Sequence, residues 1–184
     1  MIKTKNRIIQ DDFSVKWYRH LTLQRKQLED YSACFEIDLL WEKAKDFSVY
    51  DDSGNKFIDM TSGIFVANAG HSNPLIKKAI KDCLKKDLLY SFCYNTKIRI
   101  EFLNYLFSIS PKYFNKAVLM NSGSEAVEIA YRLIKTWGRE RNKKYIVSFE
   151  DSYHGRGLAG CLLSRNNEYS GWSNVKDDVI FFVF

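Results

Sequence analysis

Two short polar segments of this 184-residue chain contain the residue types expected of a site for a phosphorylated aromatic molecule. The first is Asn121-Ser122-Gly123-Ser124-Glu125-Ala126, which precedes an amphipathic stretch. The unpaired N–H groups at a helix N-terminus carry partial positive charge and bind phosphate. Gly123 leaves room for an anion, and Ser124 adds a hydroxyl donor. The segment therefore predicts a phosphate cradle, and the alternative is a Ser-Gly-Ser sequence that only caps a helix.

The second segment is Ser152-Tyr153-His154-Gly155-Arg156-Gly157. The Tyr153 ring can cover a flat heteroaromatic ligand, and His154 can hydrogen-bond to such a ligand or tune it near neutral pH. The alternative is a surface turn with a packed tyrosine. The first segment is not a Walker loop, since no G-K-[ST] follows it, and it does not have the dinucleotide fingerprint G-x-G-x-x-G. Together the two segments favour a phosphorylated aromatic cofactor over a nucleotide.

Each segment follows an apolar run that is typical of a strand covered on both faces. The runs are Ala117–Met120 and Tyr145–Phe149, and Val179–Phe184 is a third. Strands that alternate with helices predict an α/β fold with a mostly parallel sheet and right-handed crossovers. Ligands bind at the carboxyl ends of the strands in such sheets, so the two segments are expected to lie side by side there.

The predicted helix between the first two runs has a clear start. Ser122 and Glu125 match the S-x-x-E capping box, so the helix begins near Gly123 or Ser124. One helical face then collects the apolar residues Ala126, Ile129, Ala130, Leu133, Ile134 and Trp137.

Four further elements are predicted upstream. Residues 47–60 form a hairpin around the turn formers at 51–55. Asn73 and Pro74 begin a helix. Another helix spans 96–107 and stops before Pro111. Near-helical spacing of apolar residues predicts a helix over 13–28.

Composition sets the remaining expectations. The net charge of +6 is modest and calls for no nucleic acid. The lysines between residues 77 and 86 are interpreted as the solvated side of a helix, with an acidic partner as the alternative. No C-x-x-C pair occurs and the three histidines are far apart, so no metal site is expected. Without an apolar leader or membrane span, a cytoplasmic protein with reduced thiols is expected.

In this order and spacing, the motifs from about residue 45 onward resemble the first part of the class III aminotransferases, which are fold type I pyridoxal-phosphate enzymes. The motifs are Tyr50–Met60, Ser62-Gly63-Ile64, Gly70–Pro74, Asn121–Glu128 and Tyr153-His154-Gly155-Arg156. The resemblance implies an incomplete fold type I domain. In this fold, 46–112 would be part of the small domain with connecting helices, and 113–184 the beginning of the large cofactor-binding domain. Residues 1–45 contain none of these motifs and are expected, from their apolar spacing, to be a helical N-terminal extension.

The resemblance also implies roles for individual residues. Gly123 and Ser124 would hold the phosphate of pyridoxal 5'-phosphate, while Tyr153 would stack on its pyridine ring with His154 beside it. Ile64 and Tyr94 resemble residues that line the substrate pocket, and the alternative for both is core packing.

The family's Schiff-base lysine and the acidic residue that protonates the cofactor both follow the Tyr-His-Gly loop. Here no Asp-Glu pair follows Tyr153, and the lysine that does, Lys176, is not assigned as catalytic. The full-length protein, a homodimer by resemblance, would transfer an amino group from an amine or amino acid to an oxo acid, and this chain alone would be inactive. The alternatives are a non-catalytic module for cofactor binding or dimerisation, and another fold type I enzyme such as an aminomutase.

Overall fold

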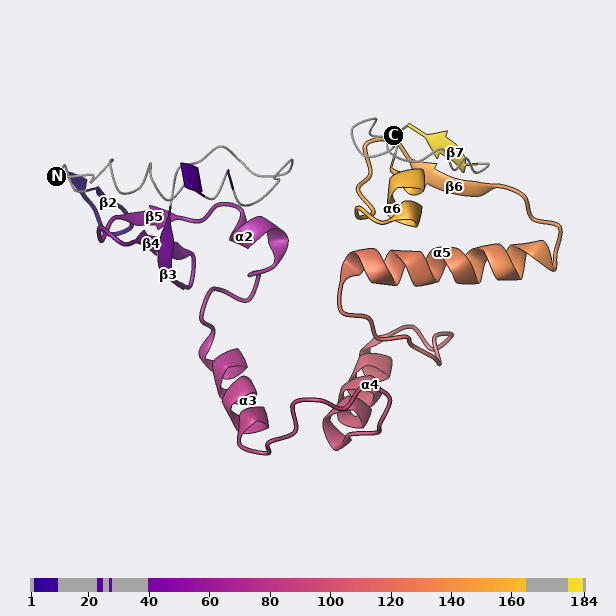
Figure 1. The fold of residues 1–184 in the computed structure, drawn as a ribbon, viewed down its shortest axis with the longest axis horizontal. Helices are drawn as coiled ribbons and strands as arrows, with labels where there is room; N and C mark the ends of the chain where they lie inside the picture. Colours follow the sequence, from indigo (N-terminus) through magenta and orange to yellow (C-terminus); the bar gives the residue numbers. More distant parts are fainter. Residues whose placement is uncertain (1, 10–22, 25–26, 28–39, 165–178, 184) are drawn as a thin grey trace. The chain divides into compact units, whose positions relative to one another are not determined.

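The computed structural model describes residues 2–9, 23–24, 27, 40–164 and 179–183. The chain divides into two compact units, Met1–Tyr94 and Asn95–Phe184. Figure 1 labels their helices and strands.

The first unit contains a five-stranded antiparallel sheet with the strand order β1-β2-β5-β4-β3. Its strands are β1 (Ile2–Lys3), β2 (Ile8–Ile9), β3 (Trp41–Lys45), β4 (Ser48–Asp51) and β5 (Lys56–Ile58). The pairing of β4 with β5 confirms the predicted hairpin.

The turn of this hairpin is closed by two side chains. The Asn55 backbone N–H donates to Asp51 Oδ1 and the Asn55 amide donates to Asp51 Oδ2, both at 2.7 Å. Asn55 is fully buried, and Gly54 between them has a φ of +80°, a left-handed conformation that glycine adopts readily. The polar residues at 51–55 therefore form the hairpin turn that their residue types predict.

Residues 1–45 were predicted to be helical, yet β1, β2 and β3 lie in this segment. Strands of two residues are too short to show a period in the sequence, and they exist because they find pairing partners, as Ile8 pairs with Lys56. The helix predicted over 13–28 falls largely outside the described residues. Leu23, Gln24 and Gln27 are described there and are helical.

Two elements follow β5 in the first unit, the short turn labelled α2 (Ser62–Phe65), whose backbone is not that of a regular right-handed helix, and the helix α3 (Pro74–Leu84). Asn73 Oδ1 accepts hydrogen bonds from the N–H groups of Leu75 and Ile76, which confirms the predicted cap before Pro74. The lysines of α3 are exposed as predicted, and Lys78 pairs with Asp82 at 2.6 Å in solvent.

The second unit contains α4 (Lys97–Ile109), α5 (Gly123–Arg139), β6 (Ile146–Phe149), α6 (Leu158–Leu163) and β7 (Val179–Phe182). The Thr96 hydroxyl caps α4 by accepting from Arg99 N–H, and the helix ends two residues later than predicted but still before Pro111. Strands β6 and β7 are parallel and pair from Ile146 with Val179 to Phe149 with Phe182. This pair confirms the predicted parallel arrangement.

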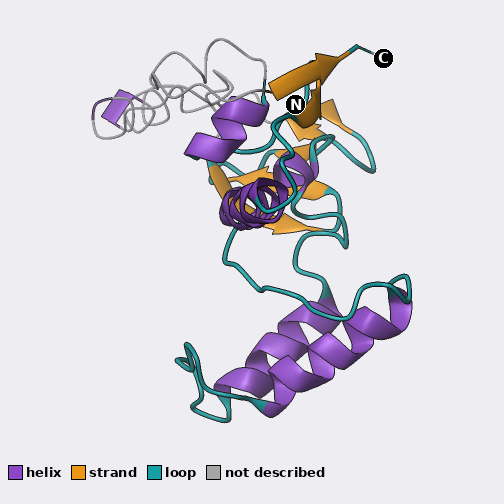
Figure 2. Ribbon diagram, turned by 90° about the vertical axis from the view of Figure 1, so that its right-hand side faces the viewer, coloured by secondary structure: helices purple, strands orange, loops and turns teal. Residues whose placement is uncertain are grey.

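The strand predicted over Ala117–Met120 is wrong. Within the continuous stretch 59–145 the chain forms helices and loops, apart from a single bridge at His71. Figure 2 distinguishes the helices, strands and loops of the described residues by colour. A strand needs a neighbour for its backbone N–H and C=O groups, and among the described residues β6 pairs only with β7. Val118 is accordingly 62% exposed.

The start of α5 carries the complete predicted capping box. Ser122 Oγ accepts from Glu125 N–H, and Glu125 Oε2 accepts from the N–H groups of Asn121 and Ser122. We expect Ser122→Ala to lower the free energy of unfolding by about 1 kcal/mol, because an N–H of the first turn loses its acceptor. Urea unfolding followed by circular dichroism measures this. Ser108→Ala on α4 is the control, and an equal loss in both variants would contradict the capping role.

Candidate functional site

The first turn of α5 presents unused backbone donors. Glu125 engages the N–H groups of Asn121 and Ser122, whereas those of Gly123 and Ser124 have no protein acceptor within the described part of the chain. A Cβ added at Gly123 would meet no atom within 4 Å, so the space there is open. Two free N–H groups, a neighbouring hydroxyl and open space are the features of an anion cradle, and they fit a phosphate group.

The loop that contains Tyr153 and His154 contacts this cradle directly. Gly155 is buried with a φ of +105°, and a Cβ on it would lie 2.9 Å from Ser124 Cβ and 3.0 Å from Ser124 Cα. Only glycine tolerates both this backbone conformation and this approach. The structure therefore brings together the two segments that the sequence predicted to lie side by side.

A second contact fixes the loop to α5. Glu128 Oε1 accepts from Ala159 N–H at 2.8 Å, at the start of α6, which lies beside α5 (Figure 1). A Cβ on Gly157 would approach Glu128 Cδ to 3.1 Å. Gly160 in α6 packs against the loop backbone, where a Cβ would lie 2.8 Å from the His154 carbonyl oxygen. Neither Glu128 nor Gly160 was assigned a role from the sequence. The spacing did indicate a place near the site for Glu128, because a residue four positions after Ser124 lies on the same face of the helix.

His154 is held by two serines, Ser148 and Ser164, whose roles were not predicted from the sequence. Its backbone N–H donates to Ser164 Oγ at 3.0 Å, and its Nε2 lies 3.3 Å from Ser148 Oγ. The Ser148 hydroxyl donates its proton to the Leu163 carbonyl at 2.7 Å, so it accepts from the ring, and Nε2 carries a hydrogen. Ser148 and Ser164 are both buried.

The three predicted aromatic and apolar site residues are exposed. Tyr153 is 62% exposed on the loop beside the cradle. Tyr94 is 75% and Ile64 50% exposed in the first unit, so the described residues do not pack them in a core, which was the alternative for both. Their contact with a substrate stays a prediction.

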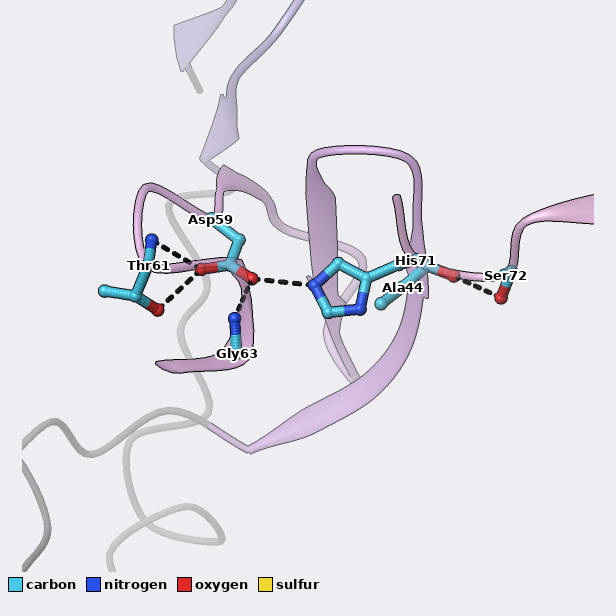
Figure 3. A network of polar contacts seen from close by, with 6 residues as sticks. All are labelled: Ala44, Asp59, Thr61, Gly63, His71 and Ser72. Atoms are coloured by element: carbon cyan, nitrogen blue, oxygen red, sulfur yellow. Dashed lines mark hydrogen bonds and ion pairs between the residues drawn. The ribbon is translucent and has the colours of Figure 1, made fainter. Parts of the chain in front are cut away.

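The first unit contains a buried carboxylate network, drawn in Figure 3. The Asp59 side chain is 3% exposed and accepts from Thr61, Gly63 and His71. Burial raises the pKa of Asp59, but the hydrogen bonds from His71, Thr61 and Gly63 outweigh burial and lower this pKa from 3.8 to about 2.

The Asp59 carboxylate should therefore make stability depend on pH. Its pKa is lower in the folded chain than in the unfolded chain, so its contribution, about 2 kcal/mol, is complete above pH 3.8 and is lost as the pH falls through about 2. We expect Asp59→Asn to be less stable than wild type near pH 6, and we expect the two free energies of unfolding to converge as the pH falls to about 2. Asp52→Asn, at an exposed position, should show no such convergence. A constant gap between the Asp59 variant and wild type would contradict the prediction.

A membrane-spanning helix and a metal site are both absent from the residues that the structure describes. These residues contain no helix that is both long and apolar enough to cross a bilayer. Nor do they contain a group of three or more His, Cys, Asp or Glu side chains placed to hold a metal ion.

Sequence comparisons agree with the geometry. The model of the family described as Aminotransferase class-III matches residues 32–182. The [LysW]-aminoadipate semialdehyde/glutamate semialdehyde transaminase of Sulfolobus acidocaldarius is 35% identical over 121 residues, which cover 66% of this chain and 30% of that protein. Ornithine aminotransferase 2 of Staphylococcus aureus is 34% identical over 138 residues, 72% of this chain and 34% of that protein. The chain thus spans about a third of the length of these relatives.

Solved structures share the fold. The ornithine aminotransferase of Toxoplasma gondii superposes with a TM-score of 0.74 at 18% identity, over 96% of this chain and 44% of that one. A transaminase from directed evolution by ancestral reconstruction superposes with a TM-score of 0.76 at 17% identity, over 90% of this chain and 40% of that one. These neighbours are fold type I aminotransferases. Because the family model covers most of the chain, the chain belongs to the class III aminotransferases.

Proposed function

We propose that the protein to which this chain belongs transfers an amino group from an amine or amino acid to an oxo acid, using pyridoxal 5'-phosphate. Class III aminotransferases depend on this cofactor. The observation that carries the proposal is the contact between Ser124 and Gly155, because it puts the free N–H groups of α5 beside the loop of Tyr153. A phosphate site next to an exposed aromatic ring suits a phosphorylated pyridine.

Each residue of the site then has a role. The N–H groups of Gly123 and Ser124, with the Ser124 hydroxyl, would bind the phosphate. The Tyr153 ring would cover one face of the pyridine. His154 would stand beside it in the orientation that Ser148 and Ser164 impose. When bound, the cofactor supplies an electron sink for chemistry at the carbon that bears the amine.

The substrate side of the proposal rests on the first unit and on relatives. Ile64 and Tyr94 would line the amine pocket of the protein, which we propose to be a homodimer. The two relatives are named for ornithine and for semialdehydes. Semialdehyde products favour a donor whose reacting amine is on a terminal carbon. Activity of the whole protein with ornithine but not with alanine would support this donor class, and the reverse preference would contradict it.

The cofactor-binding proposal is tested by adding pyridoxal phosphate to residues 1–184 and measuring bound ligand by equilibrium dialysis. We expect binding that inorganic phosphate competes away. We expect no turnover, because Lys176 is the one lysine after Tyr153 and it is not assigned as the Schiff-base lysine. Binding that phosphate does not affect would contradict the cradle, and measured turnover would contradict the expected inactivity of these residues alone.

A further inference from the structure

The turn formed by α2 (Ser62–Phe65) has an unusual backbone. The φ angles of Ser62, Gly63, Ile64 and Phe65 are +51°, +61°, +63° and +64°, so four successive residues lie in the left-handed region. Glycine adopts this conformation readily, but for a β-branched residue such as Ile64 it is a genuine outlier. A turn of this kind persists where the surrounding structure holds it, and such turns occur disproportionately at functional sites.

The Asp59 carboxylate is the group that holds this turn. Its Oδ1 accepts from the Thr61 N–H at 2.9 Å and from the Thr61 hydroxyl at 2.8 Å. Its Oδ2 accepts from the Gly63 N–H at 2.8 Å and from His71 Nε2 at 2.7 Å (Figure 3). Both carboxylate oxygens are thus occupied, and the donors Thr61 and Gly63 flank Ser62, the first residue of the turn. The Asp59 side chain is 3% exposed.

His71 is itself fixed from outside the turn. Its N–H and C=O pair with the C=O and N–H of Asp46, both at 2.8 Å, in the connection between β3 and β4. Its ring also makes a T-shaped contact with the ring of Trp41 in β3, with ring centroids 5.6 Å apart and planes at 86°. His71 therefore ties Asp59, and through Asp59 the left-handed turn, to the antiparallel sheet.

We propose that Asp59 and His71 are positioning residues that hold the turn Ser62–Phe65 in its left-handed form and so set the direction in which the Ile64 side chain leaves the backbone. Ile64 is 50% exposed. The consequence for catalysis rests on the proposed function, in which Ile64 lines the amine pocket. There the pair would shape the pocket without touching the substrate.

The test compares wild-type residues 1–184 with His71→Leu and His71→Gln by NMR, without cofactor. Leucine removes the donor, whereas glutamine reaches about as far as Nε2 and retains an N–H. We expect the leucine variant to shift the Ile64 methyl signals and to speed hydrogen exchange of the Gly63 amide by about tenfold or more. We expect glutamine to restore both towards wild type. The Val147 amide in β6, in the other unit, should not change.

Wild-type Gly63 exchange and Ile64 signals in the leucine variant would overturn the proposal, as would a glutamine variant that behaves like leucine. Thr61→Val provides a milder test if His71→Leu does not fold. It removes the hydroxyl bond to Asp59 Oδ1 and keeps the side-chain shape, so a smaller change in the same direction supports the proposal and no change overturns it. Because these measurements need no cofactor, a failure of pyridoxal phosphate to bind would refute the proposed function and leave this result intact.

In the whole protein the same substitution separates positioning from general damage. His71→Leu is expected to raise the KM for the amine while kcat and the affinity for pyridoxal phosphate stay near wild type. Weaker cofactor binding together with a lower kcat would show general damage and overturn the positioning role.

Discussion

Replacing Gly123 with alanine is expected to weaken the binding of pyridoxal phosphate by about tenfold or more without lowering the stability of the chain. The new Cβ enters open space beside two unused N–H groups, where the phosphate would lie, and meets no protein atom within 4 Å. Alanine also favours a helix more than glycine does. Equilibrium dialysis and thermal unfolding measure the two effects.

The control for this substitution is Ser108→Ala on α4, which should alter neither the binding nor the stability appreciably. Unchanged cofactor affinity in the Gly123 variant would contradict a phosphate site at the first turn of α5. A large loss of stability would mean that Gly123 is a structural glycine.

Replacing Gly155 with alanine should lower both the stability of the chain and the binding of the cofactor. We expect a loss of about 2–4 kcal/mol in the free energy of unfolding, together with the loss of cofactor binding. The residue has a φ of +105°, and its Cβ would lie 2.9 Å from Ser124 Cβ, so the loop and α5 would be forced apart. Urea unfolding and dialysis of the same preparation measure both quantities.

The two glycine variants together separate contact with the ligand from support of the site. Gly123→Ala should reduce binding alone, whereas Gly155→Ala should reduce stability and binding together. A Gly155 variant as stable as wild type would contradict the close packing of Ser124 on this residue.

Local signals in the sequence predicted much of the fold. The caps at Asn73, Thr96 and Ser122 each involve residues two or three positions apart, so their side-chain types predict where the helices begin. The hairpin turn at Asp51–Asn55 is equally local. The two site segments do lie together as predicted, but the prediction relied on two parallel strands ending at one edge, and the first of these, Ala117–Met120, does not form.

Contacts between distant residues could not be predicted in this way. Glu128 bonds to Ala159, 31 positions away, and His154 to Ser164, ten positions away. Asp59 meets His71 across twelve positions. The left-handed turn was also hidden, because isoleucine and phenylalanine disfavour positive φ and give no warning of it. The apolar run Ala117–Met120 was misleading for a related reason, since a strand depends on a partner that the run itself does not reveal.

The most direct test of the cradle compares the affinity of residues 1–184 for pyridoxal phosphate with their affinity for pyridoxal, which lacks the phosphate. If the N–H groups of Gly123 and Ser124 bind the phosphate, pyridoxal phosphate should bind about a hundredfold more tightly than pyridoxal. This difference in affinity should be smaller in Gly123→Ala. Equal affinities for the two ligands in the wild-type chain would contradict the account.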